Sequence, residues 1–322
     1  MSFWRYALRR VGAALLLIFI VASAALLLTI AVANVSVSED AQDSKDRERI
    51  RAELGLDQPI LTQYTAWVAR AIRLDFGRSI LYRRPVTDLL RERSANTATL
   101  ATAVILATTL IGIPLGIYTG LRTRQIGARV VRVLSLILVS TPPLVTSLAL
   151  VTIAGRTGWP VGGKTSPGSA WEPFTMPWML DVAQHLVLPT VALALPLAAI
   201  LERLQSDALA SNADSIVVKA ALARGLSPDQ ARLRHAWRGS LGSVLGLYGV
   251  IVGSLLSGSF VVEFVTAWPG LGRLMYDALL ARDLFLVAGT AAAGAFFLAL
   301  GTLMSDLMHA AADPRVLIEG RR

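Results

Sequence analysis

Six long stretches of the chain contain no Asp, Glu, Lys or Arg, and this pattern limits the fold more than any other feature. They are Val11–Val32, Ala98–Leu121, Val133–Ala154, Val182–Leu201, Leu241–Val262 and Leu284–Ser305. A helix needs about 20 apolar residues to cross the hydrocarbon core of a bilayer. Lipid offers no partner to an open backbone, and the alternation that a barrel needs is missing, so each run must be helical. The sequence therefore predicts an all-α polytopic membrane protein with about six transmembrane helices.

The composition agrees with this class and narrows the chemistry. Of the 322 residues, 54% are hydrophobic and only 16% are charged, whereas a soluble domain carries about a quarter charged residues. The net charge of +9 could indicate nucleic-acid binding, but the basic residues lie between the apolar runs and not along one soluble face. The chain has no cysteine, and His185, His235 and His309 are too far apart for a metal site. We expect no catalytic, cofactor-binding or metal-binding residue.

The distribution of basic residues predicts the orientation. If the N-terminus is cytoplasmic, 16 of the 31 Lys and Arg residues fall in cytoplasmic segments and four in the two short outer loops. Basic residues are enriched in short cytoplasmic loops, so both termini are expected in the cytoplasm. The first run is longer than the roughly 7–15 residues of a signal-peptide core, so we expect an uncleaved anchor and not a signal peptide.

Three regions are predicted along the chain. Residues 1–32 hold the N-terminus and the first transmembrane helix, residues 33–97 form a small extracytoplasmic helical subdomain, and residues 98–322 form a five-helix transmembrane core that includes the loop at 202–240. Within the subdomain, residues 47–56 predict an amphipathic helix ended by Gly55, and a second helix is expected from about Ile60 to Leu74. The subdomain is too long for a simple connector. It is either a lid on the helical bundle or a docking surface for an external partner.

Prolines and glycines mark special places within the runs. Four prolines remove backbone donors inside the membrane: Pro142, Pro143, Pro189 and Pro196. The second run also carries glycines at four-residue spacing: Gly112, Gly116 and Gly120. Such a glycine face lets a neighbouring helix approach closely. These residues either serve packing in the bundle or line a path through it.

The cytoplasmic loop at 202–240 carries the densest helix signals. Residues 214–224 predict a short helix, and Gly225 ends it because glycine tolerates the left-handed conformation beyond a helix end. Ser227-Pro228-Asp229-Gln230 then predicts a new helix, with an N-cap, a proline at the first position, an acid near the positive end of the dipole and a glutamine closing a capping box. Two helices joined by so tight a turn form a rigid elbow between two membrane spans. Ala220 and Ala221 are expected to be exposed on it, beside Arg224.

Short motifs in a fixed order connect this elbow to a known family. The longest is Lys219-Ala220-Ala221-Leu222-Ala223-Arg224-Gly225-Leu226-Ser227, followed by Arg234-His235-Ala236 and Arg238. The others are Leu54-Gly55-Leu56-Asp57-Gln58-Pro59, Gln63-Tyr64, Asp75-Phe76-Gly77-Arg78-Ser79, Arg84-Pro85-Val86, Gly112-Ile113-Pro114-Leu115-Gly116, Trp268-Pro269-Gly270-Leu271-Gly272, Arg282-Asp283 and Asp313-Pro314-Arg315. Together they resemble the permeases of bacterial ATP-binding-cassette importers of the dipeptide, oligopeptide and nickel class, which have the type I importer fold. The longest motif is similar to the family's EAA loop, although Lys219 replaces the usual Glu and Ser243 a usual Pro.

The resemblance implies a transport subunit that is not itself an enzyme. Such a subunit forms the path for peptides or a related solute, such as a nickel or other metal chelate, glutathione or an oligosaccharide. The implied partners are a second permease, two cytoplasmic ATPases that bind the ATP and Mg, and an extracytoplasmic solute-binding protein, all at the bacterial inner membrane. The elbow is then a coupling helix that docks on an ATPase. The coupling residues expected from the resemblance are Lys219, Ala220, Ala221, Arg224, Gly225, Ser227 and Gln230.

Two other functions compete with this interpretation. An ion-gradient-driven secondary carrier predicts ionisable residues within the membrane and usually an internal repeat. A membrane-embedded enzyme needs a catalytic constellation. Neither feature is evident in the sequence, so the importer subunit is the preferred hypothesis and the carrier its alternative.

Two further signals have an ordinary explanation. Residues 158–165 satisfy the Walker A expression, but they follow a membrane span, whereas a phosphate loop follows a strand and opens a helix. Four acidic residues lie at the edges of the apolar runs: Glu202, Glu263, Asp283 and Asp306. Buried acids in membranes are often functional, as in proton relays. Because these four flank the runs, interfacial anchoring is the expected role.

Overall fold

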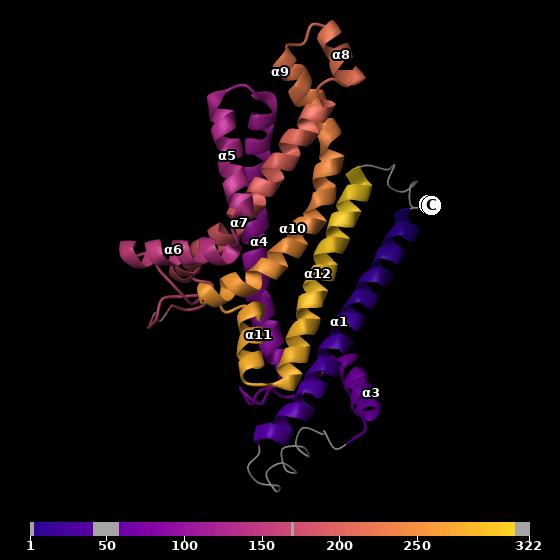
Figure 1. Cartoon of the computed structure of the whole chain (residues 1–322), viewed down its shortest axis with the longest axis vertical. Helices are drawn as coiled ribbons and strands as arrows, with labels where there is room; N and C mark the ends of the chain where they lie inside the picture. Colours follow the sequence, from indigo (N-terminus) through magenta and orange to yellow (C-terminus); the bar gives the residue numbers. More distant parts are fainter. Residues whose placement is uncertain (1–2, 41–57, 169–170, 313–322) are drawn as a thin grey trace. The chain divides into compact units, whose positions relative to one another are not determined.

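The described part of the chain is built from helices. The computed structural model describes residues 3–40, 58–168 and 171–312, and these ranges contain helices and loops but no β-strand (Figure 1). The predicted all-α fold is confirmed. The elements are α1 (Phe3–Asp40), α3 (Ile60–Ala71), α4 (Val86–Leu121), α5 (Ile126–Ser140), α6 (Pro143–Thr157), α7 (Met176–Asn212), α8 (Ile216–Ala223), α9 (Pro228–Ala231), η1 (Arg232–Ala236), α10 (Trp237–Val265), α11 (Leu271–Leu280) and α12 (Leu284–Ala312).

Five helices are long and apolar enough to cross a bilayer. They include Trp4–Leu28, Val86–Leu121, Met176–Asn212, Val244–Val265 and Leu284–Ala310. The pair α5 and α6 adds a sixth span if the two are counted as one. The chain is therefore a multi-pass membrane protein, with five or six spans against the six that the apolar runs predict.

The third apolar run is not one straight helix. α5 ends at Ser140, and α6 begins at Pro143 with a bend of 104° between them. Thr141 and Pro142 are extended, because the residue before a proline is pushed out of the helical region and here two prolines follow each other. Pro143 suits the first position of α6, where no backbone donor is needed. Pro114 in α4, and Pro189 and Pro196 in α7, leave those helices continuous.

The chain divides into two compact units. The larger comprises Met1–Val11, Ala98–Trp268 and Leu300–Arg322, and the smaller comprises Gly12–Thr97 and Pro269–Ala299. The predicted helix at 60–74 is present as α3, whereas the amphipathic helix predicted at 47–56 lies outside the described residues. The division into residues 1–32, 33–97 and 98–322 stays a prediction.

In the larger unit, the glycine face of α4 packs against α7. A Cβ atom on Gly116 would lie 2.6 Å from the Cβ of Gln205 and from the backbone oxygen of Glu202. A Cβ on Gly112 would lie 2.9 Å from the Cβ of Leu201. No side chain fits at such separations, so glycine is what allows the two backbones to come this close. The glycine spacing therefore serves helix packing, as the sequence suggested.

In the smaller unit, motifs distant in sequence meet around Asp283, which is fully buried and caps the start of α12. Its carboxylate accepts hydrogen bonds from the side chain of Ser79 and the backbone of Leu81. Nearby, the hydroxyl of Tyr82 donates to Asp277 over 3.2 Å, and burial together with this carboxylate raises the pKa of Tyr82. Tyr82 therefore stays a protonated donor. These contacts hold the loop before α4 against the start of α12.

Candidate functional site

The elbow predicted in the loop at 202–240 is present, but it is shorter than that loop. α7 continues to Asn212 and α10 begins at Trp237, so the elbow proper consists of residues 213–236. Figure 1 shows α8 and α9 as a small helical cap beyond the ends of α7 and α10. The base of the elbow is narrow, since a Cβ on Gly239 would lie 2.8 Å from Oδ1 of Asn212.

Gly225 ends α8 in the left-handed conformation that the sequence predicted. Its φ is +88°, and an added Cβ would meet no atom within 4 Å. The amide of Gly225 donates to the carbonyl of Leu222 over 2.9 Å, and the amide of Leu226 donates to that of Ala221 over 3.2 Å. This pair of hydrogen bonds is the Schellman motif, which satisfies the last carbonyls of a helix. The turn is therefore fixed by backbone conformation and not by side-chain crowding.

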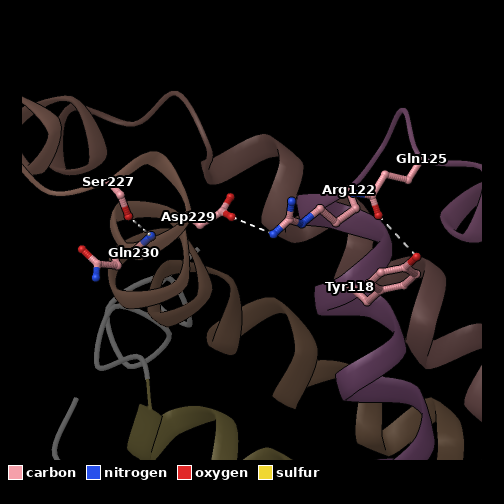
Figure 2. Close-up of polar contacts among 6 residues, drawn as sticks. All are labelled: Tyr118, Arg122, Gln125, Ser227, Asp229 and Gln230. Carbon is pink, nitrogen blue, oxygen red and sulfur yellow. Dashed lines mark hydrogen bonds and ion pairs between the residues drawn. The ribbon is translucent and has the colours of Figure 1, made fainter.

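The second helix of the elbow begins as predicted, at Ser227. The Ser227 hydroxyl accepts a hydrogen bond from the amide of Gln230 over 3.4 Å, and Pro228 occupies the first helical position. Figure 2 shows the Gln230 carboxamide directed away from the Ser227 hydroxyl. The N-cap half of the predicted capping box is thus formed. The short α9 passes directly into η1, a π-helical turn, before α10 starts.

The inner face of the elbow has its own apolar core. Val218 and Ala221 of α8 pack with Leu209 of α7, and Ala231 and Ala236 complete the cluster. Ala221 is only 4% exposed, so the expectation that both Ala220 and Ala221 are exposed is wrong for Ala221. Ala221 lies three residues after Val218, on the same helical face, and that face turns inward. Its small size allows α8 to lie close to α7.

The outer face of α8 is apolar at its start and basic towards its end. Ile216 is 84% exposed and Val217 is 54% exposed. Lys219, Ala220 and Arg224 are exposed as well. The motif comparison missed Ile216 and Val217 because it began at Lys219. Their signal in the sequence was a pair of β-branched apolar residues directly after the polar residues Asp214 and Ser215.

An ion pair fastens the elbow to a third membrane helix. Nη2 of Arg122, at the end of α4, lies 2.9 Å from Oδ2 of Asp229 in α9 (Figure 2). Both side chains are about half exposed, so the pair itself contributes only about 0.2–1 kcal/mol. The ion pair matters mainly for geometry, because it holds α9 at a defined position relative to the end of α4. No local pattern predicts this pairing, because the two residues are 107 positions apart.

Glu202 lies beneath the elbow and is fully buried. Its Oε1 accepts a hydrogen bond of 2.5 Å from the hydroxyl of Thr119 in α4. Gln205, one turn further on, donates to Ser240 of α10 over 3.0 Å. These contacts join α7 to both neighbouring helices just before the elbow begins.

Three of the four edge acids, Glu202, Glu263 and Asp283, are fully buried inside the protein. α7 continues ten residues beyond Glu202, so Glu202 does not lie at a helix end. Their anchoring at the membrane interface stays a prediction. Asp306 remains partly exposed and pairs with Arg10 at 3.1 Å.

The Walker A-like segment at 158–165 lies in a loop between two helices. It follows α6, and α7 starts only at Met176. The amide of Gly163 donates to the carbonyl of Ala267, and Nζ of Lys164 lies 5.4 Å from the ring centre of Trp178. This context differs from a phosphate loop between a strand and a helix. Within residues 3–40, 58–168 and 171–312, no group of three His, Cys, Asp or Glu side chains is placed to hold a metal ion.

Comparison with known proteins decides the family. The family described as "Binding-protein-dependent transport system inner membrane component" matches residues 112–318, and the N-terminal domain model of the same systems matches residues 3–101. The chain belongs to this family. Its longer matched region contains the whole elbow, from α8 to η1.

Named relatives of this inner membrane component cover most of the chain. The oligopeptide transport system permease protein OppB of Mycobacterium tuberculosis is 34% identical over 277 residues, which is 83% of each chain. A protein of Brucella abortus with the provisional name peptide transport system permease protein is 34% identical over 285 residues, or 88% of each chain. A Brucella ovis protein provisionally named a peptide permease is 28% identical over 288 residues.

Proposed function

We propose that this chain is a permease subunit of an ATP-driven peptide importer, and that its elbow receives the motion of a cytoplasmic ATPase. Family membership supports the transport role, and the names of the relatives support peptides as the substrate class. The chain itself is then a transport subunit without an active site, and ATP and Mg bind to the partner ATPases. Nickel or other metal chelates, glutathione and oligosaccharides are the alternative substrates. The same uptake assay tests each of them when it is supplied in labelled form.

The main support for the proposal is that the elbow is held in a fixed conformation. Its turn is fixed at Gly225, its second helix is capped by Ser227, and its inner face packs on α7. We expect α8 and α9 to move together as a rigid unit, because hydrogen bonds and not a flexible loop fix the turn between them. The exposed Ile216, Val217 and Ala220 offer an apolar contact surface. Lys219 and Arg224 add positive charge beside it.

The orientation follows from the basic residues. The elbow and its neighbourhood carry many of the Lys and Arg residues counted above, and we place them in the cytoplasm, with both termini on the same side. An ATPase that docks on the elbow then meets ATP in the cytoplasm. The proposed assembly contains this chain, a second similar permease, two ATPases and an external solute-binding protein, in a bacterial inner membrane.

One experiment tests the proposal directly. The full-length chain is purified with its partner subunits and reconstituted in proteoliposomes, and uptake of a labelled peptide mixture is measured with ATP, without ATP and with an ion gradient alone. The importer predicts uptake that requires both ATP and the binding protein. Uptake driven by the ion gradient without ATP would establish the secondary carrier in its place.

A further inference from the structure

A cavity of about 700 Å³ lies inside the smaller unit. It is bounded by α1, by α3 and the loop after it, by the first turns of α4 and by α12. Its walls are almost wholly apolar and include Leu15, Phe19, Val68, Leu90 and Phe296. The volume falls in the range of about 300–1,000 Å³ that is usual for sites holding a small molecule.

Two of the helices that line the cavity reach it near the middle of their candidate membrane spans. Leu15 and Phe19 are in the middle of the α1 span, Trp4–Leu28. Ala292 and Phe296 are eight and twelve residues into the α12 span, which begins at Leu284, so they lie about 12–18 Å along that helix. Water has few partners in such a site, and its occupant must be apolar and reach it from the membrane.

One edge of the cavity is polar, in contrast to its apolar walls. Arg91 and Ser94, from the first turns of α4, belong to its lining. Arg91 is exposed, and among the described residues its guanidinium forms no ion pair. Trp67 also lines the cavity and is only 4% exposed. A cation therefore borders a space that is otherwise apolar.

We propose that this cavity holds an acyl chain of an anionic phospholipid, with the phosphate beside Arg91. A phospholipid combines the required parts: an apolar chain and a negative charge beyond it. A protein helix about 10 Å wide would fill about 700 Å³ in fewer than two turns, so an extended chain suits the space better. Since lipid tails are as apolar as the wall, the charge of Arg91 must supply the selectivity.

Native mass spectrometry of the full-length chain with its partner subunits tests this inference. The protein is incubated with equal amounts of dioleoyl phosphatidylglycerol and dioleoyl phosphatidylcholine in mild detergent. We expect one retained phospholipid per chain and a preference for phosphatidylglycerol. Arg91→Gln should reduce that preference about fivefold, which corresponds to about 1 kcal/mol for one basic residue near a lipid head group. The control Arg73→Gln removes an exposed arginine outside the lining and should change nothing.

Filling the cavity is the second test. Ala71 lines it, whereas Ala69 is exposed and does not. Ala71→Phe should abolish retention of both lipids, and Ala69→Phe should retain them. Phosphatidylglycerol with brominated chains gives a readout on the unmutated cavity, because bromine quenches nearby indole fluorescence. The quenching seen in the wild-type protein but not in Trp67→Phe is the part due to Trp67. We expect this part to saturate at one lipid per chain.

Three results would overturn the inference. The first is a wild-type protein that retains no phospholipid. The cavity would then be assigned to a different occupant, such as a segment of a partner protein. The second is equal retention of both lipids with no effect of Arg91→Gln, which removes the anionic head group from the proposal. The third is unquenched Trp67 beside bound lipid, which places that lipid elsewhere. None of these outcomes depends on transport, so the proposed importer function stands or falls separately.

Discussion

Oδ2 of Asp283 lies 2.6 Å from the hydroxyl of Ser79, across 204 positions of the sequence. The two residues belong to separate family motifs, Asp75–Ser79 and Arg282–Asp283, and the fold brings these motifs together in the smaller unit. We expect Asp283→Asn to lower the free energy of unfolding by about 1–3 kcal/mol, because an amide cannot accept all the hydrogen bonds of the buried carboxylate. Thermal unfolding in detergent measures the change. Asp207→Asn, at an exposed site on α7, is the control and should leave the unfolding temperature unchanged.

Gly225→Val should reduce peptide uptake more than ATP hydrolysis. The left-handed backbone at φ +88° costs a residue with a Cβ about 1–2 kcal/mol, so the turn relaxes and the elbow loses its fixed angle. Asparagine adopts this conformation more easily, and Gly225→Asn should keep most of the uptake. Gly158→Val introduces the same strain at φ +71° in another loop. Equal loss of uptake in the Gly158 and Gly225 variants would point to general destabilisation and contradict a specific role of the elbow.

Two adjacent alanines should respond differently to the same change. Ala221 is buried against Val218 and Leu209, so Ala221→Arg should lower stability by more than about 2 kcal/mol through burial of a charge. Ala220 is exposed, so Ala220→Arg should leave the unfolding temperature unchanged and weaken co-purification of the ATPase. The measurements are thermal unfolding and the ATPase to permease ratio after affinity purification. Normal ATPase recovery with Ala220→Arg would exclude this face as the docking surface.

Gly116→Ala should be far more damaging than an ordinary helix substitution. The added Cβ would lie 2.6 Å from both Gln205 and the backbone of Glu202, and such overpacking costs about 1–3 kcal/mol. Gly155→Ala is the matched control, since a Cβ there meets nothing within 4 Å. The control should be neutral or stabilising by up to about 1 kcal/mol because alanine favours the helix. Folded yield by size-exclusion chromatography and thermal unfolding compare the two.

The Arg122–Asp229 pair should matter more for transport than for stability. As a half-exposed pair it contributes about 0.2–1 kcal/mol, so Arg122→Asp should shift the unfolding temperature little. Uptake per ATP hydrolysed should fall, because α9 loses its fixed position against α4. The exchange Arg122→Asp with Asp229→Arg should restore uptake, whereas Arg124→Asp, at a neighbouring exposed arginine, should leave it unchanged. Failure of the exchange to restore uptake would separate the pair from coupling.

The sequence predicted the features that arise from local rules. Apolar runs of membrane length gave the number of spans, and Gly225 and Ser227-Pro228 marked the ends of the elbow helices. The spacing of Gly112, Gly116 and Gly120 indicated a close helix contact, although not that α7 would be the partner. Each of these features depends on residues that are neighbours in the sequence, or on the requirement that a segment in lipid be apolar and helical. Both can be recognised from the sequence.

Features that depend on tertiary contacts escaped prediction. The buried state of Ala221 follows from the direction in which α8 turns towards α7, and that of Glu202 from the contact of α7 with Thr119 of α4. The pairing of Arg122 with Asp229 joins helices whose relative position no local pattern contains. The bend of 104° at Pro142 and Pro143 was visible as an interruption, but its angle depends on how α6 packs on α7 and α10.

The length of α7 sets the scale of any motion that begins at the elbow. Its 37 residues form one continuous helix, which is about 55 Å long. A tilt of about 5° around the end near Asn212 therefore displaces the end near Met176 by about 5 Å, close to one helical turn. The same tilt moves a point about 10 Å from the pivot by only about 1 Å. A small displacement where a partner touches α8 is therefore enough to shift the side chains at the far end of α7 sideways by several times that distance.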